Sequence, residues 1–255
     1  MTVLQAAILG ILQGLTEFLP ISSSGHLVIA QHFLNVKDGG ILFEVLLHFA
    51  TLSAIVAVYR KDLLELIKHP FQKYTYLLLA GTIPTGIIGL VFKDSFEKLF
   101  SSVTIVGYML LITGFILLAA EFFSRIIFGS EVLTYWQAVG IGIAQGIAIT
   151  PGISRSGTTI AAGLLLGMDR KEAARFSFLL SIPAILGASV LEVKDIVLSS
   201  QLSADIILPY AIGILCAAIS GYFAIKLLLG ILTKGKLYYF SIYCWLLGAA
   251  TILLA

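Results

Sequence analysis

Long apolar runs separated by short polar segments make up most of this chain. An α-helix needs about 20 apolar residues to cross the roughly 30 Å hydrocarbon core of a bilayer. Six runs reach or approach that length: residues 41–59, 76–92, 103–123, 176–191, 206–229 and 238–254. The pattern therefore predicts an all-α polytopic membrane protein with six full transmembrane helices.

Two further apolar segments, residues 3–33 and 136–166, are interrupted near the middle by serine, glycine and proline. Non-helical backbone at membrane depth is tolerated only where protein or water covers it. We therefore expect each segment to form two half-helices that dip into the membrane and return on the same side, as a re-entrant helical hairpin.

The two interruptions repeat the same polar residues at a separation of 132 positions. Residues 10–25 align without gaps on residues 142–157, with eight identities in sixteen positions. Shifted by one residue, the similarity continues beyond the hairpins, where these positions match: Phe43, Lys61 and Asp62 with Phe176, Lys194 and Asp195. We expect one integral-membrane domain, residues 1–255, made of two repeats of about 1–130 and 131–255. Each repeat would hold one hairpin and three spans, and this odd number inverts the second repeat relative to the first.

The distribution of lysine and arginine predicts the orientation, because these residues collect in cytoplasmic loops. One side of the predicted topology carries ten of them: Arg60, Lys61, Lys68, Lys73, Arg125, Arg170, Lys171, Arg175, Lys234 and Lys236. The other side carries four: Lys37, Lys93, Lys98 and Lys194. This difference places both termini outside. The hairpins then start from opposite faces of the membrane, and their tips can meet inside it.

The composition agrees with a membrane protein. Hydrophobic residues make up 59% of the chain and charged residues only 12%, whereas about a quarter of the residues in soluble domains are charged. The net charge of +2 gives no indication of nucleic-acid binding. Cys216 and Cys244 lie in apolar runs, which favours a packing role over a disulfide or a metal site.

The repeated interruptions also contain ionisable side chains, which are costly at membrane depth and mark candidate functional sites. The first interruption carries Glu17 and His26, and the second carries Arg155. Helix N-termini, glycines, hydroxyl donors and a guanidinium together suit the binding of phosphate. The expected substrate-binding residues around the two tips are Gln13, Ser22, Ser24, Gly25, Ser154, Ser156, Gly157, Thr158 and Thr159.

A serine next to a histidine, with a carboxylate in reach, supplies a nucleophile, a proton carrier and an orienting group. The plainer alternative is a flexible serine-rich turn in which Arg155 and Glu17 only neutralise each other. Complementary residues in two repeated tips favour a functional site over that alternative. Glu44 and His48 lie four positions apart on the first full span. They either extend this site or form a pair at the end of their helix, and the sequence leaves both open.

Residues 13–26, with the sequence QGLTEFLPISSSGH, resemble the (E/Q)xxxE…PxSSxGH region of the bacterial undecaprenyl-diphosphatase family, also called bacitracin-resistance proteins. Residues 151–159, PGISRSGTT, resemble that family's PGxSRSxxT motif, and the likeness runs over essentially the whole chain. The resemblance implies removal of the terminal phosphate from undecaprenyl diphosphate, a lipid carrier recycled in peptidoglycan synthesis, and resistance to bacitracin. It also implies a divalent cation, Mg²⁺ or Ca²⁺. Gln13 stands where some members have a second glutamate, which leaves Glu17 as the expected metal ligand.

The mechanism expected from these residues is phosphoryl transfer to Ser23. Arg155 and the tip amides would hold the diphosphate and stabilise charge on the transferred group. His26 would accept or relay the proton of Ser23, and Glu17 would orient His26 or the cation. Water would then hydrolyse the phosphoserine. The sequence also leaves open His26 itself, or water, as the attacking group.

A lipid transporter or flippase is the rival function, since inverted repeats with broken helices also build carriers. The serine, histidine and glutamate beside the arginine favour an enzyme, because binding alone needs no nucleophile. We expect a multi-pass protein of the bacterial cell membrane whose active site opens to the outer face. The expected partners are undecaprenyl diphosphate and membrane lipids, without nucleic acid. The sequence leaves the oligomeric state open, with a homodimer as one alternative.

Overall fold

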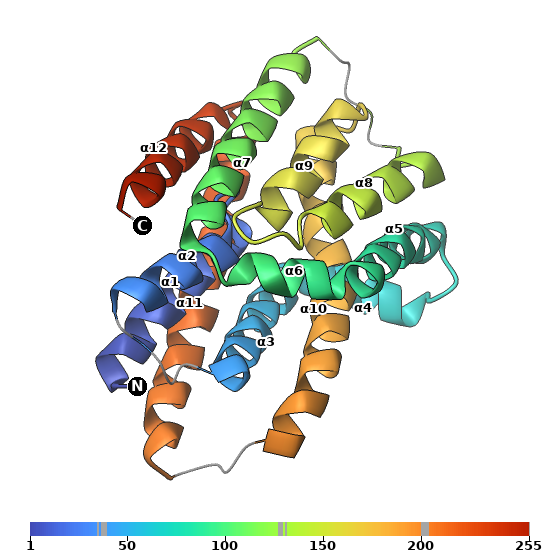
Figure 1. Ribbon diagram of the computed structural model, residues 1–255. Coiled ribbons are helices and arrows are strands. Elements are labelled where there is room, and N and C mark those ends of the chain that lie inside the picture. Colours follow the sequence, from blue (N-terminus) through green and yellow to red (C-terminus); the bar gives the residue numbers. More distant parts are fainter. Residues whose placement is uncertain (35, 37–39, 127–129, 131, 200–203, 255) are drawn as a thin grey trace.

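The computed structural model describes residues 1–34, 36, 40–126, 130, 132–199 and 204–254. Within them the regular elements are α-helices and one short 3-10 helix, with an isolated β-bridge between Ser130 and Met168. The helices of the first half are α1 (Val3–Phe18), α2 (Ser23–Phe33), α3 (Gly40–Val58), α4 (Arg60–Lys68), α5 (Lys73–Val91), α6 (Lys93–Phe100) and α7 (Val103–Phe123) (Figure 1). Those of the second half are α8 (Tyr135–Ile147), α9 (Arg155–Leu165), α10 (Arg170–Ser199), η1 (Ala204–Ile206), α11 (Ile207–Leu232) and α12 (Tyr238–Leu254). The all-α class expected from the sequence is confirmed.

Four helices among the described residues are long and apolar enough to cross a membrane: α5, α7, α11 and the Arg170–Val190 part of α10. The helices α3 and α4 give a fifth candidate as a bent pair, because the chain turns by 84° between Leu42–Val58 and Arg60–Lys68. The sixth predicted run forms α12, which is apolar but only 17 residues long. A multi-pass membrane protein is therefore supported, while the full count of six spans stays a prediction.

The two interrupted segments form helices that stop and restart where the polar residues lie. The helix α1 ends at Phe18 and α2 begins at Ser23, whereas α8 ends at Ile147 and α9 begins at Arg155. Proline restricts the residue before it to extended backbone, and Leu19, before Pro20, has φ −67° and ψ 144°. The two arms of each segment pack on each other, and Figure 1 shows α8 and α9 diverging from their shared connection. Both segments are helical hairpins.

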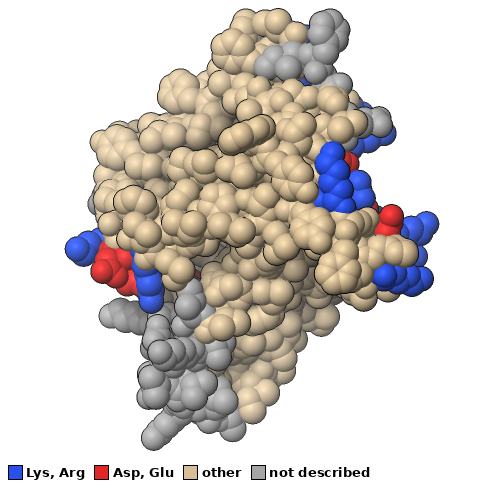
Figure 2. Space-filling view, turned by 90° about the vertical axis from the view of Figure 1, so that its right-hand side faces the viewer, with Lys and Arg blue, Asp and Glu red and all other residues tan. Residues whose placement is uncertain are grey.

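Large apolar side chains cover much of the outside of the helices. Examples on α5 and α7 are Ile83, Ile87, Leu90 and Phe115, each more than half exposed. Figure 2 shows one face almost entirely without charged residues, with lysine, arginine, aspartate and glutamate gathered at its margins. Monomeric soluble proteins rarely expose continuous apolar patches of more than a few hundred Å². This exterior fits contact with lipid.

Equivalent hydrogen bonds recur in the two halves at the separation of 132 residues. Thr2 caps α1 in a capping box with Gln5, and Thr134 caps α8 in the same way with Gln137. Each glutamine amide also donates to the far arm of its own hairpin, at 3.2 Å and 2.8 Å, to the carbonyls of Leu34 and Leu166. The structural repetition therefore extends over both hairpins and well beyond the sixteen positions that align most clearly in the sequence.

The hairpin of each half packs against a long helix of the other half. The helix α1 lies along α11, and α8 lies along α5. At these crossings Gly10 faces Gly213 and Gly142 faces Gly81, so closely that a Cβ on Gly10 or Gly142 would overlap the facing carbonyl. Small residues allow such close approach of helix backbones. The two halves are interlocked through equivalent glycine contacts.

Further helix pairs bring the halves together, among them α7 with α12 and α3 with α10. Gly107 meets Gly248 where α7 crosses α12, and the indole of Trp245 donates to the Leu111 carbonyl at 3.1 Å. On α10, the ring of Phe178 packs edge-on against Phe18 of the first hairpin. The main apolar core thus contains residues of both hairpins and of the helices that cross them.

A buried carboxylate fastens the start of α12. Glu121, at the end of α7, is 3% exposed and accepts hydrogen bonds from Arg125 at 3.2 Å and from Arg170 at 3.2 Å and 3.3 Å. It also accepts from the backbone amide of Leu237 at 3.2 Å. A buried charge needs such partners to offset its lost hydration. This network fixes α7, α10 and the first turn of α12 relative to one another.

Two short charged helices, α4 and α6, bury none of their residues. They carry basic residues used in the orientation argument, including Lys61 on α4 and Lys98 on α6. Lys37 and the side chains of Lys194 and Asp195 lie outside the described residues. The charge difference and the repeat at those positions therefore stay predictions.

Candidate active site

Each hairpin tip begins its second helix with a serine cap. Ser22 precedes α2 and Ser154 precedes α9, and the Oγ of each accepts from the backbone amide three residues on, at 3.3 Å and 3.1 Å. Serine is a favoured N-cap because its oxygen satisfies an amide that has no partner within the helix. The first helical residues of the two second arms are therefore Ser23 and Arg155, which occupy equivalent positions in the repeat.

The backbone at both tips adopts positive φ. Ser22 has φ 69° and is the only non-glycine residue of the described chain with a positive value. Gly152 has φ 89°, and a Cβ there would come within 2.6 Å of the Val106 carbonyl oxygen. Sparsely populated backbone conformations cost about 1–3 kcal/mol and cluster at functional sites. The first tip stores this strain immediately before Ser23.

Glu17 joins the two tips. Its Oε2 accepts a hydrogen bond from the Ser23 hydroxyl at 2.6 Å and another from the Gln13 amide at 2.9 Å. Its Oε1 forms an ion pair with the Arg155 guanidinium of the other hairpin. The sequence prediction that the tips meet is borne out at this carboxylate. It lies between a hydroxyl from the first tip and a guanidinium from the second.

His48 also reaches this carboxylate. Its Nδ1 lies 3.1 Å from the Gln13 amide nitrogen and 3.7 Å from Glu17 Oε2. Glu44, one turn earlier on α3, instead accepts from the Gln31 amide at 2.9 Å. The pair that the sequence left open is therefore divided, with His48 at the site and Glu44 bonded to α2.

His26 makes its hydrogen bonds to partners other than Ser23. Its Nδ1 lies 2.7 Å from the Ser22 carbonyl oxygen, and its Nε2 lies 2.8 Å from the hydroxyl of Tyr243 on α12. Of the two roles expected for Glu17, orienting His26 or the cation, the first has no hydrogen bond among the described residues, where Glu17 bonds Ser23 instead. The structure therefore brings together Glu17, Ser23 and Arg155, and it holds His26 at the same tip with a different partner.

Only part of the predicted set is accessible. Ser23, Ser24 and Arg155 are half-buried, whereas the other predicted residues of the tips are buried. Several buried hydroxyls bond within the protein: Ser156 donates to the Leu19 carbonyl at 3.1 Å, and Thr159 lies 2.6 Å from Ser177. These side chains build the tips and join them. A ligand reaching the site would first meet Ser23, Ser24 and Arg155.

Comparison with known proteins shows the family of this chain. A family model described as "Bacitracin resistance protein BacA" matches residues 6–250. The chain belongs to this family. It is 51% identical over 257 residues to an undecaprenyl-diphosphatase of Halothermothrix orenii, covering 100% of this chain and 99% of that protein. It is 48% identical over 251 residues to an undecaprenyl-diphosphatase of Carboxydothermus hydrogenoformans, covering 98% of this chain and 96% of that protein. Family membership confirms the resemblance seen in the two motifs.

Two residues outside the family motifs of this chain also hold the tips. On α7, Thr113 donates to the Gly152 carbonyl at 2.9 Å and accepts from the Ser154 amide at 3.1 Å. On α12, Tyr243 bonds His26. Thr113 could have been noticed as a hydroxyl within an apolar run, but the sequence carries no local signal for Tyr243, which is one aromatic residue among many in its segment.

The divalent cation implied by the family resemblance finds few protein ligands here. No group of three or more histidine, cysteine, aspartate or glutamate residues suited to a metal occurs in the described chain. The Oε1 of Gln13 is buried and has no hydrogen-bond partner there, so one amide oxygen and the Glu17 carboxylate are the oxygen ligands available. Magnesium is commonly bound by one or two carboxylates together with substrate phosphates. The residues present fit a cation that arrives with a diphosphate.

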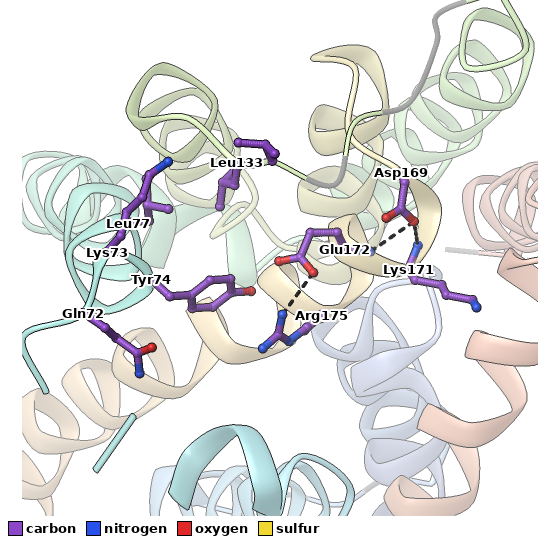
Figure 3. Close-up of a pocket in the computed structure, with 10 residues that line it drawn as sticks. Gln72, Lys73, Tyr74, Leu77, Leu133, Asp169, Lys171, Glu172 and Arg175 are labelled. Atoms are coloured by element: carbon purple, nitrogen blue, oxygen red, sulfur yellow. Dashed lines mark hydrogen bonds and ion pairs between the residues drawn. The ribbon is translucent and has the colours of Figure 1, made fainter. Parts of the chain in front are cut away.

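A cavity of about 590 Å³ lies away from the tips, at the starts of α5 and α10. Figure 3 shows the ring of Tyr74 beside Arg175, whose guanidinium lies 4.7 Å from the ring centre. Arg175 also pairs with Asp62 at 2.6 Å and with Glu172 at 3.2 Å. None of the residues predicted for the active site lines this cavity. In its lining, Arg175 pairs with Glu172, and Asp169 accepts from the backbone amides of Lys171 and Glu172. These contacts form a network separate from the tips.

Proposed function

We propose that this protein is an integral-membrane phosphatase that hydrolyses undecaprenyl diphosphate to undecaprenyl phosphate and orthophosphate. The observation that carries the proposal is the 2.6 Å hydrogen bond from Ser23 to Glu17, on a carboxylate that also pairs with Arg155. A hydroxyl to act as nucleophile, a carboxylate to act as base and a guanidinium to bind phosphate then lie together. Full-length relatives with this activity in their names support it. Recycling of the lipid carrier for peptidoglycan synthesis and resistance to bacitracin would follow.

The proposed architecture has six transmembrane helices and two re-entrant hairpins in two inverted repeats, within the bacterial cell membrane. The hydrogen bonds and glycine contacts repeated at 132 residues support the two repeats. The excess of basic residues on one predicted side supports placing both termini outside. The active site would then open to the outer face, and the prenyl chain would lie along the apolar exterior in contact with lipid.

Substrate binding would separate the ion pair between Arg155 and Glu17. The Arg155 side chain is 20% exposed and that of Glu17 only 3%, so an incoming diphosphate reaches the guanidinium first. A guanidinium binds phosphate oxygens through two parallel hydrogen bonds. The Ser24 hydroxyl and the amides at the start of α2 would add further donors. Glu17 then keeps its hydrogen bonds from the Ser23 hydroxyl and the Gln13 amide, and the first of these is the bond through which it can act as a base.

In the first chemical step, Ser23 Oγ attacks the terminal phosphorus. The proton of Ser23 passes to Glu17, which already accepts its hydrogen bond. The bond from the terminal phosphorus to the bridging oxygen breaks, and that oxygen leaves with the electron pair as part of undecaprenyl phosphate. Arg155 stabilises the charge on the transferred group throughout. This gives Glu17 the role of proton acceptor for which the sequence had suggested His26.

In the second step, water attacks the phosphoserine. The water oxygen bonds to phosphorus, its proton passes to Nε2 of His26, and Ser23 Oγ leaves and takes back the proton held by Glu17. Orthophosphate departs, and His26 then releases its proton to solvent. A bound divalent cation would neutralise diphosphate charge, with Glu17 and Gln13 Oε1 as the residues to hold it.

A homodimer is a further proposal, to be checked by the mass of the purified protein in detergent.

The decisive experiment is a phosphate-release assay on purified protein in detergent with a long-chain prenyl diphosphate. One orthophosphate per substrate, with the prenyl monophosphate left intact, is the expected result. A matched Ser23→Ala variant controls for contaminating phosphatases. Folded protein without release at any divalent-cation concentration would reject the phosphatase, and movement of the prenyl diphosphate across vesicles by that protein would favour a flippase.

A further inference from the structure

The geometry points to Tyr243 as a positioning residue for His26, one that aims the Nε2 lone pair of the imidazole for catalysis. This inference rests on the proposed phosphatase function. Tyr243 lies on α12, 217 positions from His26, and it belongs to the opposite half of the chain. Its hydroxyl is 2.8 Å from Nε2.

The other ring nitrogen determines which tautomer His26 adopts. Nδ1 lies 2.7 Å from the Ser22 carbonyl oxygen, which can only accept, so Nδ1 carries the proton in the neutral imidazole. Nε2 is then the acceptor, and the Tyr243 hydroxyl donates to it. A hydrogen bond at one ring nitrogen thus defines the function of the other. Together, Ser22 and Tyr243 present Nε2 as a base.

The orientation of the imidazole is held by packing as well. The two rings are nearly parallel, at 4° with their centres 5.7 Å apart. The neighbouring Cys244 thiol contacts the Pro20 carbonyl at 3.8 Å, so two consecutive residues of α12 touch the first tip. The helix itself is anchored at its start by the bond from Leu237 to Glu121. These contacts hold α12 against the first tip, where the Tyr243 hydroxyl faces His26.

The second hairpin shows that the fold does not require such a pair. Thr158 occupies the position equivalent to His26, and its buried Oγ1 has no hydrogen-bond partner in the described part of the chain. The bonded histidine occurs only on the tip with the nucleophile and the carboxylate. Tyr243 is also 42% exposed, so it is no core-filling residue, and its hydroxyl can give way when a phosphate or water takes Nε2.

The test compares Tyr243→Phe, which keeps the ring and removes only the hydroxyl, with Tyr239→Phe as a control on the same helix. Tyr239 is exposed and its ring packs near Lys236. We expect Tyr243→Phe to lower kcat by about fivefold to tenfold, the scale of one hydrogen bond, with KM nearly unchanged. Tyr239→Phe should match the wild type.

A double-mutant cycle with His26→Ala separates positioning from general damage to the helix. If Tyr243 acts through His26, Tyr243→Phe has no further effect on kcat in the His26→Ala background. An undiminished loss in that background, or a normal kcat for Tyr243→Phe alone, would overturn the inference. Wild-type protein without phosphatase activity would instead reject the proposed function, so the two failures are distinguishable.

A spectroscopic measurement checks the same point without turnover. The chain has four histidines, so ¹⁵N-histidine labelling gives a simple spectrum in which the His26→Ala variant identifies the His26 signals. We expect the wild type to show an Nδ1-protonated ring and Tyr243→Phe to shift the Nε2 resonance. Identical His26 signals in the wild type and Tyr243→Phe would contradict the contact on which the inference depends.

Discussion

Ser23 and Arg155 occupy the same position in the two repeated hairpins, and both bond to the carboxylate of Glu17. Each is the first residue of its helix and follows a serine cap. The equivalent positions thus supply a hydroxyl from one copy and a guanidinium from the other. Glu17 itself has no acidic equivalent, since Ile149 stands at that position. The site combines residues that differ between the two copies and that the fold brings face to face.

Replacement of Ser23 tests the proposed nucleophile. Ser23→Ala should abolish phosphate release, because no other hydroxyl of the tip bonds Glu17 in the described structure. Ser24→Ala should keep measurable activity. Ser22→Ala should keep activity too but lose stability by about 0.5–2 kcal/mol, because Ser22 caps α2. Rates and thermal midpoints of the three purified variants provide the measurement. A Ser23→Ala enzyme of near-normal rate would leave His26 or water as the attacking group.

Replacement of Arg155 should affect both activity and stability. Arg155→Ala is expected to lower kcat at least about 10²-fold, because it removes a preorganised charge from the transition state. Arg155→Lys should recover only part of the rate, since a lysine cannot form the two parallel hydrogen bonds. Loss of the guanidinium also leaves Glu17 buried without its ion pair, at a cost of about 3–5 kcal/mol in the free energy of unfolding.

A second substitution separates these two effects. In the double variant Arg155→Ala with Glu17→Gln, the uncompensated charge is gone, so the thermal midpoint should rise above that of Arg155→Ala alone. Activity should stay lost, because both the base and the phosphate-binding group are missing. A double variant that is no more stable than the single one would show that the ion pair contributes little to the fold.

The hairpins and the meeting of their tips could be predicted because the repeat places the same breaks in two apolar segments. The proximity of Glu17 to Arg155 followed from that symmetry. The bond of His26 to Tyr243 could not be predicted, because it joins residues 217 positions apart and neither lies in a pattern that indicates a partner. The number of spans is equally hard to read, since α12 is apolar along its length but 17 residues long.

The burial of Glu121 illustrates a second limit of the sequence. A carboxylate near the end of an apolar run reads as a residue at the membrane surface. Its three partners come from the turn after α7, from α10 and from the segment before α12, which converge only in the folded chain. The residues around these three partners form no sequence pattern that would indicate a contact with Glu121.

The orientation in the membrane can be tested by thiol labelling. Lys98 on α6 and Lys73 at the start of α5 are both exposed, and the predicted topology places them on opposite sides. With Cys216 replaced by alanine, an impermeant reagent should label Lys98→Cys in intact cells and Lys73→Cys only after permeabilisation. Cys244 is buried and serves as the unreactive background. The reverse pattern would invert the topology and place the first hairpin on the cytoplasmic side.

The glycine contacts between the halves give a test of the interlocked repeats that is independent of chemistry. Gly10→Ala and Gly142→Ala each place a Cβ against a facing backbone carbonyl, of Gly213 and Gly81 respectively. Backbone cannot move aside as a side-chain end can, so the helix pairs must separate. Overpacking of this kind costs about 1–3 kcal/mol, and both variants should lose a similar amount of stability if the two crossings are equivalent.

Gly86→Ala provides the matched control for these variants. Gly86 lies on α5, and a Cβ there would meet nothing within 4 Å. Alanine at an unstrained helical position should therefore leave stability unchanged or raise it by about 0.4–1 kcal/mol. Thermal midpoints in one detergent, with the three variants side by side, provide the measurement. Equal midpoints for Gly142→Ala and Gly86→Ala would mean that α8 and α5 do not approach as closely as the structure places them.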